Sequence, residues 1–168
     1  MRVLGIDCGT ELTGYGIVDQ QENGNLDFVI AGAIQLNKRE AMPKRLAKVF
    51  TDLSKIIYSH LPAMVAIEEV FYSVNAKSAL KLGQVRGVAM LAASSAGLEV
   101  AEYSPLSIKS AVVGYGKAEK IQVQHMVAHL LHLAEPPRPA DAADALAIAI
   151  CHLHTHATLK RYEVASRG

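Results

Sequence analysis

The first part of the chain alternates short hydrophobic runs with polar turns, a pattern typical of strands. Val3–Cys8 predicts a buried strand that ends in a Gly9-Thr10 turn. Gly14–Val18 and Phe28–Leu36 predict two more strands, and Asn23-Gly24 between them is typical of a hairpin turn. Because the connections are short, we expect the three strands to form an antiparallel meander.

The hydrophobic spacing then changes to a helical period between Met42 and His60. Pro43 suits the first turn of a helix, and Pro62 ends it. A short buried strand, Met64–Ile67, is predicted next. The apolar positions that share one face of the helix are Leu46, Val49, Leu53, Ile56 and Ile57.

The rest of the chain predicts mainly helices. Asn75–Ala96 is a long helical segment rich in small residues, which allow close approach by its own sheet or by another subunit. Leu98–Tyr103 is a fifth strand. The remaining predicted helices are Pro105–Val113, Glu119–Leu133 and Asp141–His154. This order of elements predicts an α/β fold, a mixed five-stranded sheet with helices on both faces.

Length and composition favour a single folded domain. The chain has 168 residues, of which 51% are hydrophobic, and this excludes a disordered polypeptide. We expect one folded domain over residues 1–157 and a poorly ordered tail over 158–168. No uncharged stretch approaches the ~20 residues of a membrane span, and Asp7 interrupts any signal peptide. Two cysteines without a CxxC motif indicate a reducing, cytoplasmic location.

The formal net charge of +1 hides an uneven distribution. Between Val74 and Ala134 only three acidic residues occur, Glu99, Glu102 and Glu119. This basic middle favours binding of a polyanion, although an ordinary solvated surface is the alternative. The basic residues of the segment are Lys77, Lys81, Arg86, Lys109, Lys117 and Lys120.

Two acidic residues end predicted buried strands. Asp7 follows Val3–Ile6, and Glu68 follows Met64–Ile67. An ionised carboxylate among apolar neighbours costs several kcal/mol unless it is paired or binds a cation. Glu69 points to the opposite face of its strand from Glu68, so only one of the two can join a given site. The alternatives are that Asp7 caps the following turn and that Glu68 is a solvated strand end.

Two further acidic residues begin an apolar helix. Asp141 and Asp144 are three positions apart, which places both carboxylates on one helical face. In the first turn the helix dipole favours their ionised form. The alternative is a purely structural helix start, with Asp141 as the N-cap.

Together, the four acids suggest a site for divalent cations. Converging carboxylates raise one another's pKa values unless cations neutralise them. Oxygen ligands suit Mg²⁺, or Mn²⁺ in its place, better than zinc. Two such ions, about 3.5–4 Å apart, activate a water and stabilise the leaving oxygen of a phosphodiester.

Several spaced motifs resemble the RuvC family of Holliday-junction resolvases over most of the chain. The shared stretches are Gly5-Ile6-Asp7, Thr13–Gly16, Ala66–Glu68 through Val70-Phe71, Ser78–Gln84, Ala118–Lys120, Gln122–Met126 and Ala140–Leu146. The resemblance implies a ribonuclease-H-like fold and a homodimer that nicks a four-way DNA junction in pairs. It also implies coupling to the RuvA–RuvB branch-migration complex. Cys8 departs from the proline usual in the family.

The resemblance also assigns roles to individual residues. It places the catalytic, metal-binding carboxylates at Asp7, Glu68, Asp141 and Asp144. Phe71 matches a family phenylalanine that stacks on an unpaired base, a contact of ~1–3 kcal/mol. Lys109 and Lys120 match family lysines near the DNA phosphates. The full set of expected DNA contacts is Phe71, Lys77, Lys81, Arg86, Lys109, Lys117 and Lys120.

Three other functions remain open at this point. The Gly5–Thr10 stretch also occurs in actin-like ATPases, although the chain is too short for their two lobes. A catalytically silent nucleic-acid-binding module is a second alternative, against which the retention of all four acids argues. An RNA-processing enzyme on the same fold is the third.

Overall fold

A computed structural model describes residues 1–69 and 76–165 of the chain. The strands are β1 (Arg2–Asp7), β2 (Leu12–Gln20), β3 (Leu26–Gln35), β4 (Met64–Glu68) and β5 (Val100–Tyr103). The helices are α1 (Met42–His60), α2 (Ala76–Ser95), α3 (Pro105–Val113), α4 (Lys120–Leu130) and α5 (Ala140–Ala165). This order of elements confirms the predicted one.

The strands form one mixed sheet in the order β3-β2-β1-β4-β5. The first three strands pair antiparallel, as the predicted meander requires, and β4 and β5 add parallel to β1. The hairpin turn between β2 and β3 falls at the predicted position, where Gly24 has a φ of 90°. Because β1 and β4 run in the same direction, the residues that end them, Asp7 and Glu68, lie at one edge of the sheet.

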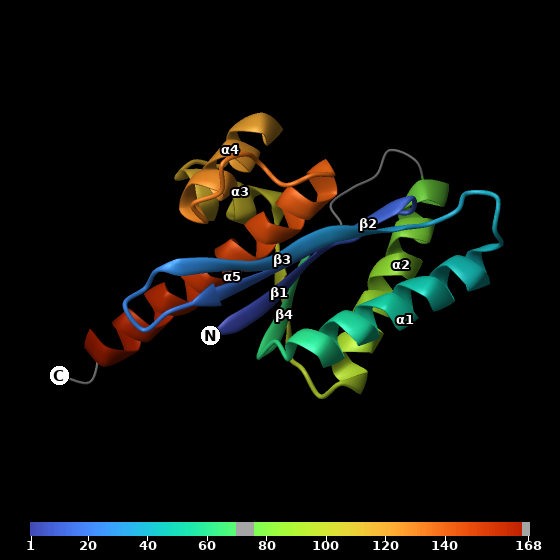
Figure 1. Ribbon diagram of the computed structural model, residues 1–168, viewed down its shortest axis with the longest axis horizontal. Coiled ribbons are helices and arrows are strands. Elements are labelled where there is room, and N and C mark those ends of the chain that lie inside the picture. Colours follow the sequence, from blue (N-terminus) through green and yellow to red (C-terminus); the bar gives the residue numbers. More distant parts are fainter. Residues whose placement is uncertain (70–75, 166–168) are drawn as a thin grey trace.

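Helices cover both faces of the sheet, as predicted (Figure 1). Helices α3, α4 and α5 lie on one face and share a core with alternate strand residues such as Val3 and Val18. Helices α1 and α2 cover the other face, where Leu4, Ile6 and Ile17 point. The period-two alternation along β1 therefore determines which of its side chains meets which helical layer.

Helix α5 packs against the sheet at unusually short range because glycines face it. A Cβ added at Gly5 or Gly14 would overlap the backbone of Ala145 or Asp141, respectively. A Cβ at Gly16 would lie 2.7 Å from Leu146 Cγ. By contrast, the glycines of α2 face open space, so the predicted close approach to its own sheet does not occur there. The glycines of β1 and β2 therefore determine how deeply the first turns of α5 lie.

The largest difference from the predicted boundaries is at the C-terminal end. Helix α5 continues to Ala165, whereas the sequence pattern ends it near His154. The backbone of residues 158–165 is thus helical, and the division into a domain over 1–157 and a tail over 158–168 stays a prediction.

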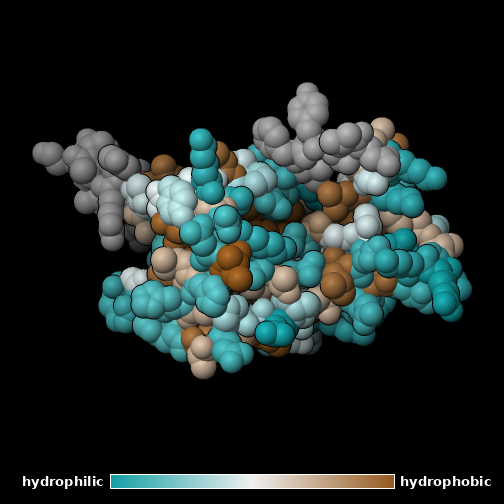
Figure 2. All heavy atoms as spheres, turned by 90° about the horizontal axis from the view of Figure 1, so that it is seen from above, coloured by the Kyte–Doolittle hydropathy of each residue, from teal (hydrophilic) through white to brown (hydrophobic). Residues whose placement is uncertain are grey.

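In the part of the chain that the structure describes, every helix is too short or too polar to cross a bilayer. The face seen from above in Figure 2 is mostly hydrophilic, with hydrophobic side chains in small separate groups.

Candidate active site

Three of the four predicted carboxylates line one pocket of about 310 Å³. Asp7 comes from the end of β1, Glu68 from the end of β4 and Asp144 from the second turn of α5. Lys109 of α3 and Lys120 of α4 line the same pocket. Its apolar wall consists of Pro105, Ile108, Val123, Ala147 and Ile148. The acids that the sequence separates widely are therefore brought together.

Asp7 has the most perturbed carboxyl group of the site. Its pKa is raised to about 7, chiefly because burial disfavours the charged form. The negative charges of Asp144, Glu68 and Asp141 add to the effect, in that order. Lys120 opposes it. Such mutual repulsion is the electrostatic signature of a site that accepts positive charge.

Glu68 shares this environment. Burial raises its pKa, the charge of Asp144 raises it further, and Lys120 and Lys109 lower it. The backbone around Glu68 is held from α2, since Arg86 Nε donates to the Glu68 carbonyl oxygen at 3.1 Å. The next residue, Glu69, does not line the pocket, in keeping with the alternation of side chains along a strand.

The first turns of α5 carry the other two acids. Asp144 Oδ2 accepts a charged hydrogen bond from Lys120 Nζ at 2.5 Å, and this bond raises the pKa of Lys120. Asp141 does not line the pocket, but its charge reaches both Asp7 and Lys120. Its backbone packs directly against Gly14, which pairs with Asp7 in the sheet.

The residues fit a hard divalent cation by their chemistry rather than by a ready-made cage. Within residues 1–69 and 76–165, no three His, Cys, Asp or Glu side chains are close enough together to hold an ion. Instead, Lys120 supplies positive charge to Asp144. The donors are all carboxylate oxygens, which suit Mg²⁺ or Mn²⁺. Burial first, and the charges of neighbouring acids second, still raise the pKa values of Asp7 and Glu68.

Cys8 is next to Asp7 in sequence but does not belong to the site. Its side chain packs with the core between the sheet and helices α1 and α2. Burial raises the pKa of its thiol to about 12, so the thiol stays protonated at neutral pH. The departure from the family's proline therefore introduces no nucleophile or metal ligand.

The predicted DNA contacts divide into several groups. Lys109 and Lys120 line the pocket, whereas Lys117 lies exposed in the loop before α4. Lys77 and Lys81 lie on exposed positions of α2, away from the pocket lining. Arg86 forms an ion pair with Glu102 and bonds the Glu68 carbonyl, so it ties α2 to the sheet. Phe71 lies outside the described residues. The roles of all these residues in DNA binding stay predictions.

The sequence reasoning missed two contributions to the site. The apolar wall from α5, Ala147 and Ile148, was not anticipated. These residues are three and four positions after Asp144, and that helical spacing is a usable signal. Gly14 was singled out only as part of a motif, although it allows Asp141 to approach the sheet.

The sheet order and the clustered carboxylates define a ribonuclease-H-like nuclease. Residues 3–152 match the family model described as "Crossover junction endodeoxyribonuclease RuvC". The RuvC protein of Koribacter versatilis is 63% identical over 161 residues, which cover 96% of this chain and 97% of that protein. The chain belongs to the RuvC family of crossover junction endodeoxyribonucleases.

Solved structures agree with this assignment. The Thermus thermophilus RuvC structure superposes with a TM-score of 0.87 and 32% identity, covering 94% of this chain and 96% of that one. The same enzyme in complex with a Holliday junction substrate gives a TM-score of 0.87 at 30% identity, with the same coverage.

Proposed function

We propose that this protein resolves Holliday junctions during homologous recombination and DNA repair, by metal-dependent hydrolysis of phosphodiester bonds at the pocket of Asp7, Glu68 and Asp144. The observation that carries the proposal is the convergence of these three carboxylates, from β1, β4 and α5, in one pocket with two lysines. Family membership supports the reaction and the four-way substrate. No covalent nucleophile is required, in keeping with the protonated thiol of Cys8.

Asp7, Glu68, Asp141 and Asp144 would hold two Mg²⁺ ions, with Mn²⁺ as a substitute. Bound there, the ions would supply an activated water and stabilise the leaving oxygen. Asp7 is central to the set, because its pKa responds to each of the other three charges. Asp144 would exchange its bond to Lys120 for metal ligation, which frees the lysine for a phosphate oxygen. Lys109, at the pocket wall, contributes a second positive charge to the phosphate.

A homodimer would place two such pockets on one junction, as paired nicking requires. The exposed face of α2 supports this. Leu80 and Leu91 are 71% and 56% exposed, and Gly83 and Gly87 between them have open space where a Cβ would be. These four residues, which we call the α2 face, repeat at helical spacing and leave room for a second backbone. Coupling to RuvA–RuvB, which rests on family resemblance alone, and a cytoplasmic location, which rests on the cysteine pattern, complete the proposal.

The direct test is incubation of the protein with a synthetic four-way junction, followed by strand-length analysis. We expect paired nicks near the crossover with Mg²⁺ or Mn²⁺ and none with EDTA. A linear duplex and a four-way RNA junction of matched sequence serve as controls. Equal cleavage of the duplex would contradict junction selectivity, and preferential cleavage of the RNA would favour an RNA-processing enzyme.

A further inference from the structure

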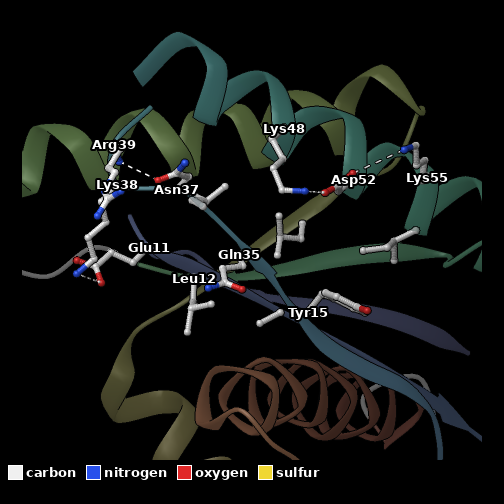
Figure 3. A pocket seen from close by; sticks show the side chains of 14 residues that line it. Glu11, Leu12, Tyr15, Gln35, Asn37, Lys38, Arg39, Lys48, Asp52 and Lys55 are labelled. Atoms are coloured by element: carbon white, nitrogen blue, oxygen red, sulfur yellow. Dashed lines mark hydrogen bonds and ion pairs between the residues drawn. The ribbon is translucent and has the colours of Figure 1, made fainter. Parts of the chain in front are cut away.

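A second groove, separate from the pocket of the carboxylates, lies between α1 and the last part of β3. Its volume is about 1040 Å³. Helix α1 contributes Lys48, Asp52 and Lys55 to its upper wall, and the segment after β3 contributes Lys38 and Arg39 (Figure 3). The remaining lining residues include Glu11, Tyr15, Gln35 and Asn37.

The groove is positively charged. Four cationic side chains line it, those of Lys38, Arg39, Lys48 and Lys55, against the two carboxylates of Glu11 and Asp52. The local surplus of two positive charges exceeds the net charge of +1 of the whole chain. An anionic ligand is therefore the one that this lining favours.

The ion pairs within the groove leave its cations available. Asp52 is shared by Lys48 at 2.6 Å and Lys55 at 3.8 Å, and Glu11 pairs with Lys38 at 2.7 Å. Lys38 and Lys55 are about 70% exposed, and pairs of this kind contribute about 0–1 kcal/mol. In the described part of the chain the Arg39 guanidinium has no carboxylate partner. A phosphate can thus recruit these groups at little cost.

The groove begins close to the residues that pair, across neighbouring strands, in line with Asp7. Asp7 pairs with Gly14, and Gly14 pairs with Ala33, which lines the groove. Two strand spacings of roughly 4.8 Å separate Asp7 from Ala33, or about 10 Å. The carboxyl ends of β1 and β3 point the same way, because both strands pair antiparallel with β2. Helix α1 lines the groove, whereas α3, α4 and α5, on the other face of the sheet, line the catalytic pocket.

The spacing of the cations suits a nucleic-acid backbone. Lys48 and Lys55 are seven residues apart on α1, a rise of about 10 Å. One strand of B-DNA carries one phosphate per about 3.4 Å of helix axis, so the distance between these two lysines corresponds to about three such axial steps. Gln35 and Asn37 add amide donors along the floor.

We propose that this groove binds the sugar–phosphate backbone of one arm of the DNA junction, outside the catalytic pocket. The inference rests on the proposed function, and it adds a second anchoring surface on each subunit. Arg39 is its central contact, because its guanidinium is the cation that no carboxylate holds. Contacts between the groove and the DNA backbone position the arm and carry no base specificity.

The first test compares Arg39→Gln with Lys44→Gln, a matched loss of one positive charge at an exposed position of α1 that does not line the groove. Junction binding is measured in EDTA over a range of salt concentrations. For Arg39→Gln we expect the slope of log K against log salt to fall by about 0.9, and affinity to fall about eightfold at 0.1 M salt. For Lys44→Gln we expect the wild-type slope.

The second test neutralises single DNA phosphates as methylphosphonates, from the crossover outward along each arm. At the phosphates that meet the groove, the change should weaken wild-type binding but add nothing to the loss in Arg39→Gln. In Lys44→Gln the same changes should weaken binding as they do in the wild type. Coupling of this kind locates the contact on the arm.

Three results would overturn the proposal. An unchanged salt slope for Arg39→Gln would remove the phosphate contact, and equal losses in the two variants would indicate only diffuse charge attraction. Unchanged junction affinity with loss of binding to an acidic protein partner would assign the groove to that partner. Because binding is measured without metal, these outcomes are distinct from failure of the proposed function, which would be absence of Mg²⁺-dependent nicking by the wild type.

Discussion

At the scale of single residues, the ionised carboxylate of Asp7 lowers the stability of the folded chain. Its proposed role in binding cations explains why this carboxylate is there. Its pKa of about 7 in the folded chain lies above the 3.8 of a free side chain, so folding favours the protonated form. The folded state then binds more protons than the unfolded state between pH 4 and 7, and stability declines as the pH rises through that window. Above pH 7 the full penalty is present, up to about 4 kcal/mol.

Asp7→Asn removes this charge and should stabilise the metal-free protein. At pH 8 without divalent ions we expect its free energy of unfolding to exceed that of the wild type by about 2–4 kcal/mol, with less difference at pH 4. Addition of Mg²⁺ should raise the melting temperature of the wild type far more than that of the variant. Denaturant titration and thermal scans measure both. A variant less stable than the wild type at pH 8 would show that the neighbouring charges do not strain Asp7.

His152 is a second residue whose charged form opposes folding, and here the charged form is the protonated one. It is 5% exposed, shares a 2.9 Å hydrogen bond with the Tyr103 hydroxyl through Nδ1, and its Nε2 has no partner among the described residues. Burial lowers its pKa, and the nearby ring of His156 lowers it further. The folded state therefore binds fewer protons than the unfolded state, and stability declines as the pH falls through 6.5 and below.

His152→Phe should flatten this acid branch of the stability profile. We expect the wild type to lose more stability than the variant between pH 7 and pH 5, as measured by urea unfolding. His154→Phe is the matched control, because His154 lies on the same helix and bonds the Ala111 carbonyl instead. Parallel profiles for the wild type and His152→Phe would mean that His152 does not remain neutral in the fold.

At the scale of elements, the position of α5 depends on the glycines beneath it. Gly14→Ala would place a Cβ into the Asp141 backbone, so the first turn of α5 must shift away from β2. We expect the cleavage rate to fall at least tenfold at saturating DNA, because misplacement of a reacting group by about 1 Å costs on the order of 100-fold.

Val18→Ala is the control for this variant. Val18 is fully buried in the same core, but it lies away from the first turn of α5, so its truncation costs stability without moving Asp141. The two variants are compared at temperatures where both are folded. Equal specific activities would show that the glycine contact does not position the carboxylates.

The elements themselves could be predicted from the sequence, and hydrophobic spacing indicates the strands and helix α1, which present a regular apolar face, more clearly than α2 and α5, which do not. Their ends were less predictable. Helix α5 continues to Ala165 because residues 155–165 contain no proline or glycine to stop it. The acids of the site could be predicted because charges that end apolar runs require compensation. The pocket's apolar wall and the bond from Lys120 to Asp144 depend on tertiary packing, which local patterns do not encode.

At the scale of the whole molecule, the paired nicking that we propose requires two subunits. Leu91→Glu places a charge on the α2 face and should shift the protein from dimer to monomer in analytical ultracentrifugation. Unpaired nicks should then replace paired ones on a junction, since each monomer acts alone. Tyr58→Glu, at an 84% exposed position of α1, is the control and should stay dimeric. A dimer that survives Leu91→Glu would place the interface elsewhere.

We propose that carboxylates from distant segments of the chain act together in one hydrolytic site. This proposal is tested most directly by single-turnover cleavage of a four-way junction by Asp7→Asn, Glu68→Gln, Asp141→Asn and Asp144→Asn, with junction binding measured in parallel. Glu69→Gln, the adjacent acid that does not line the pocket, is the matched control. We expect each of the four variants to bind the junction but to lose cleavage by at least 100-fold, on the order expected for a catalytic group, while Glu69→Gln cleaves normally. Wild-type cleavage by Asp7→Asn or Glu68→Gln would contradict it.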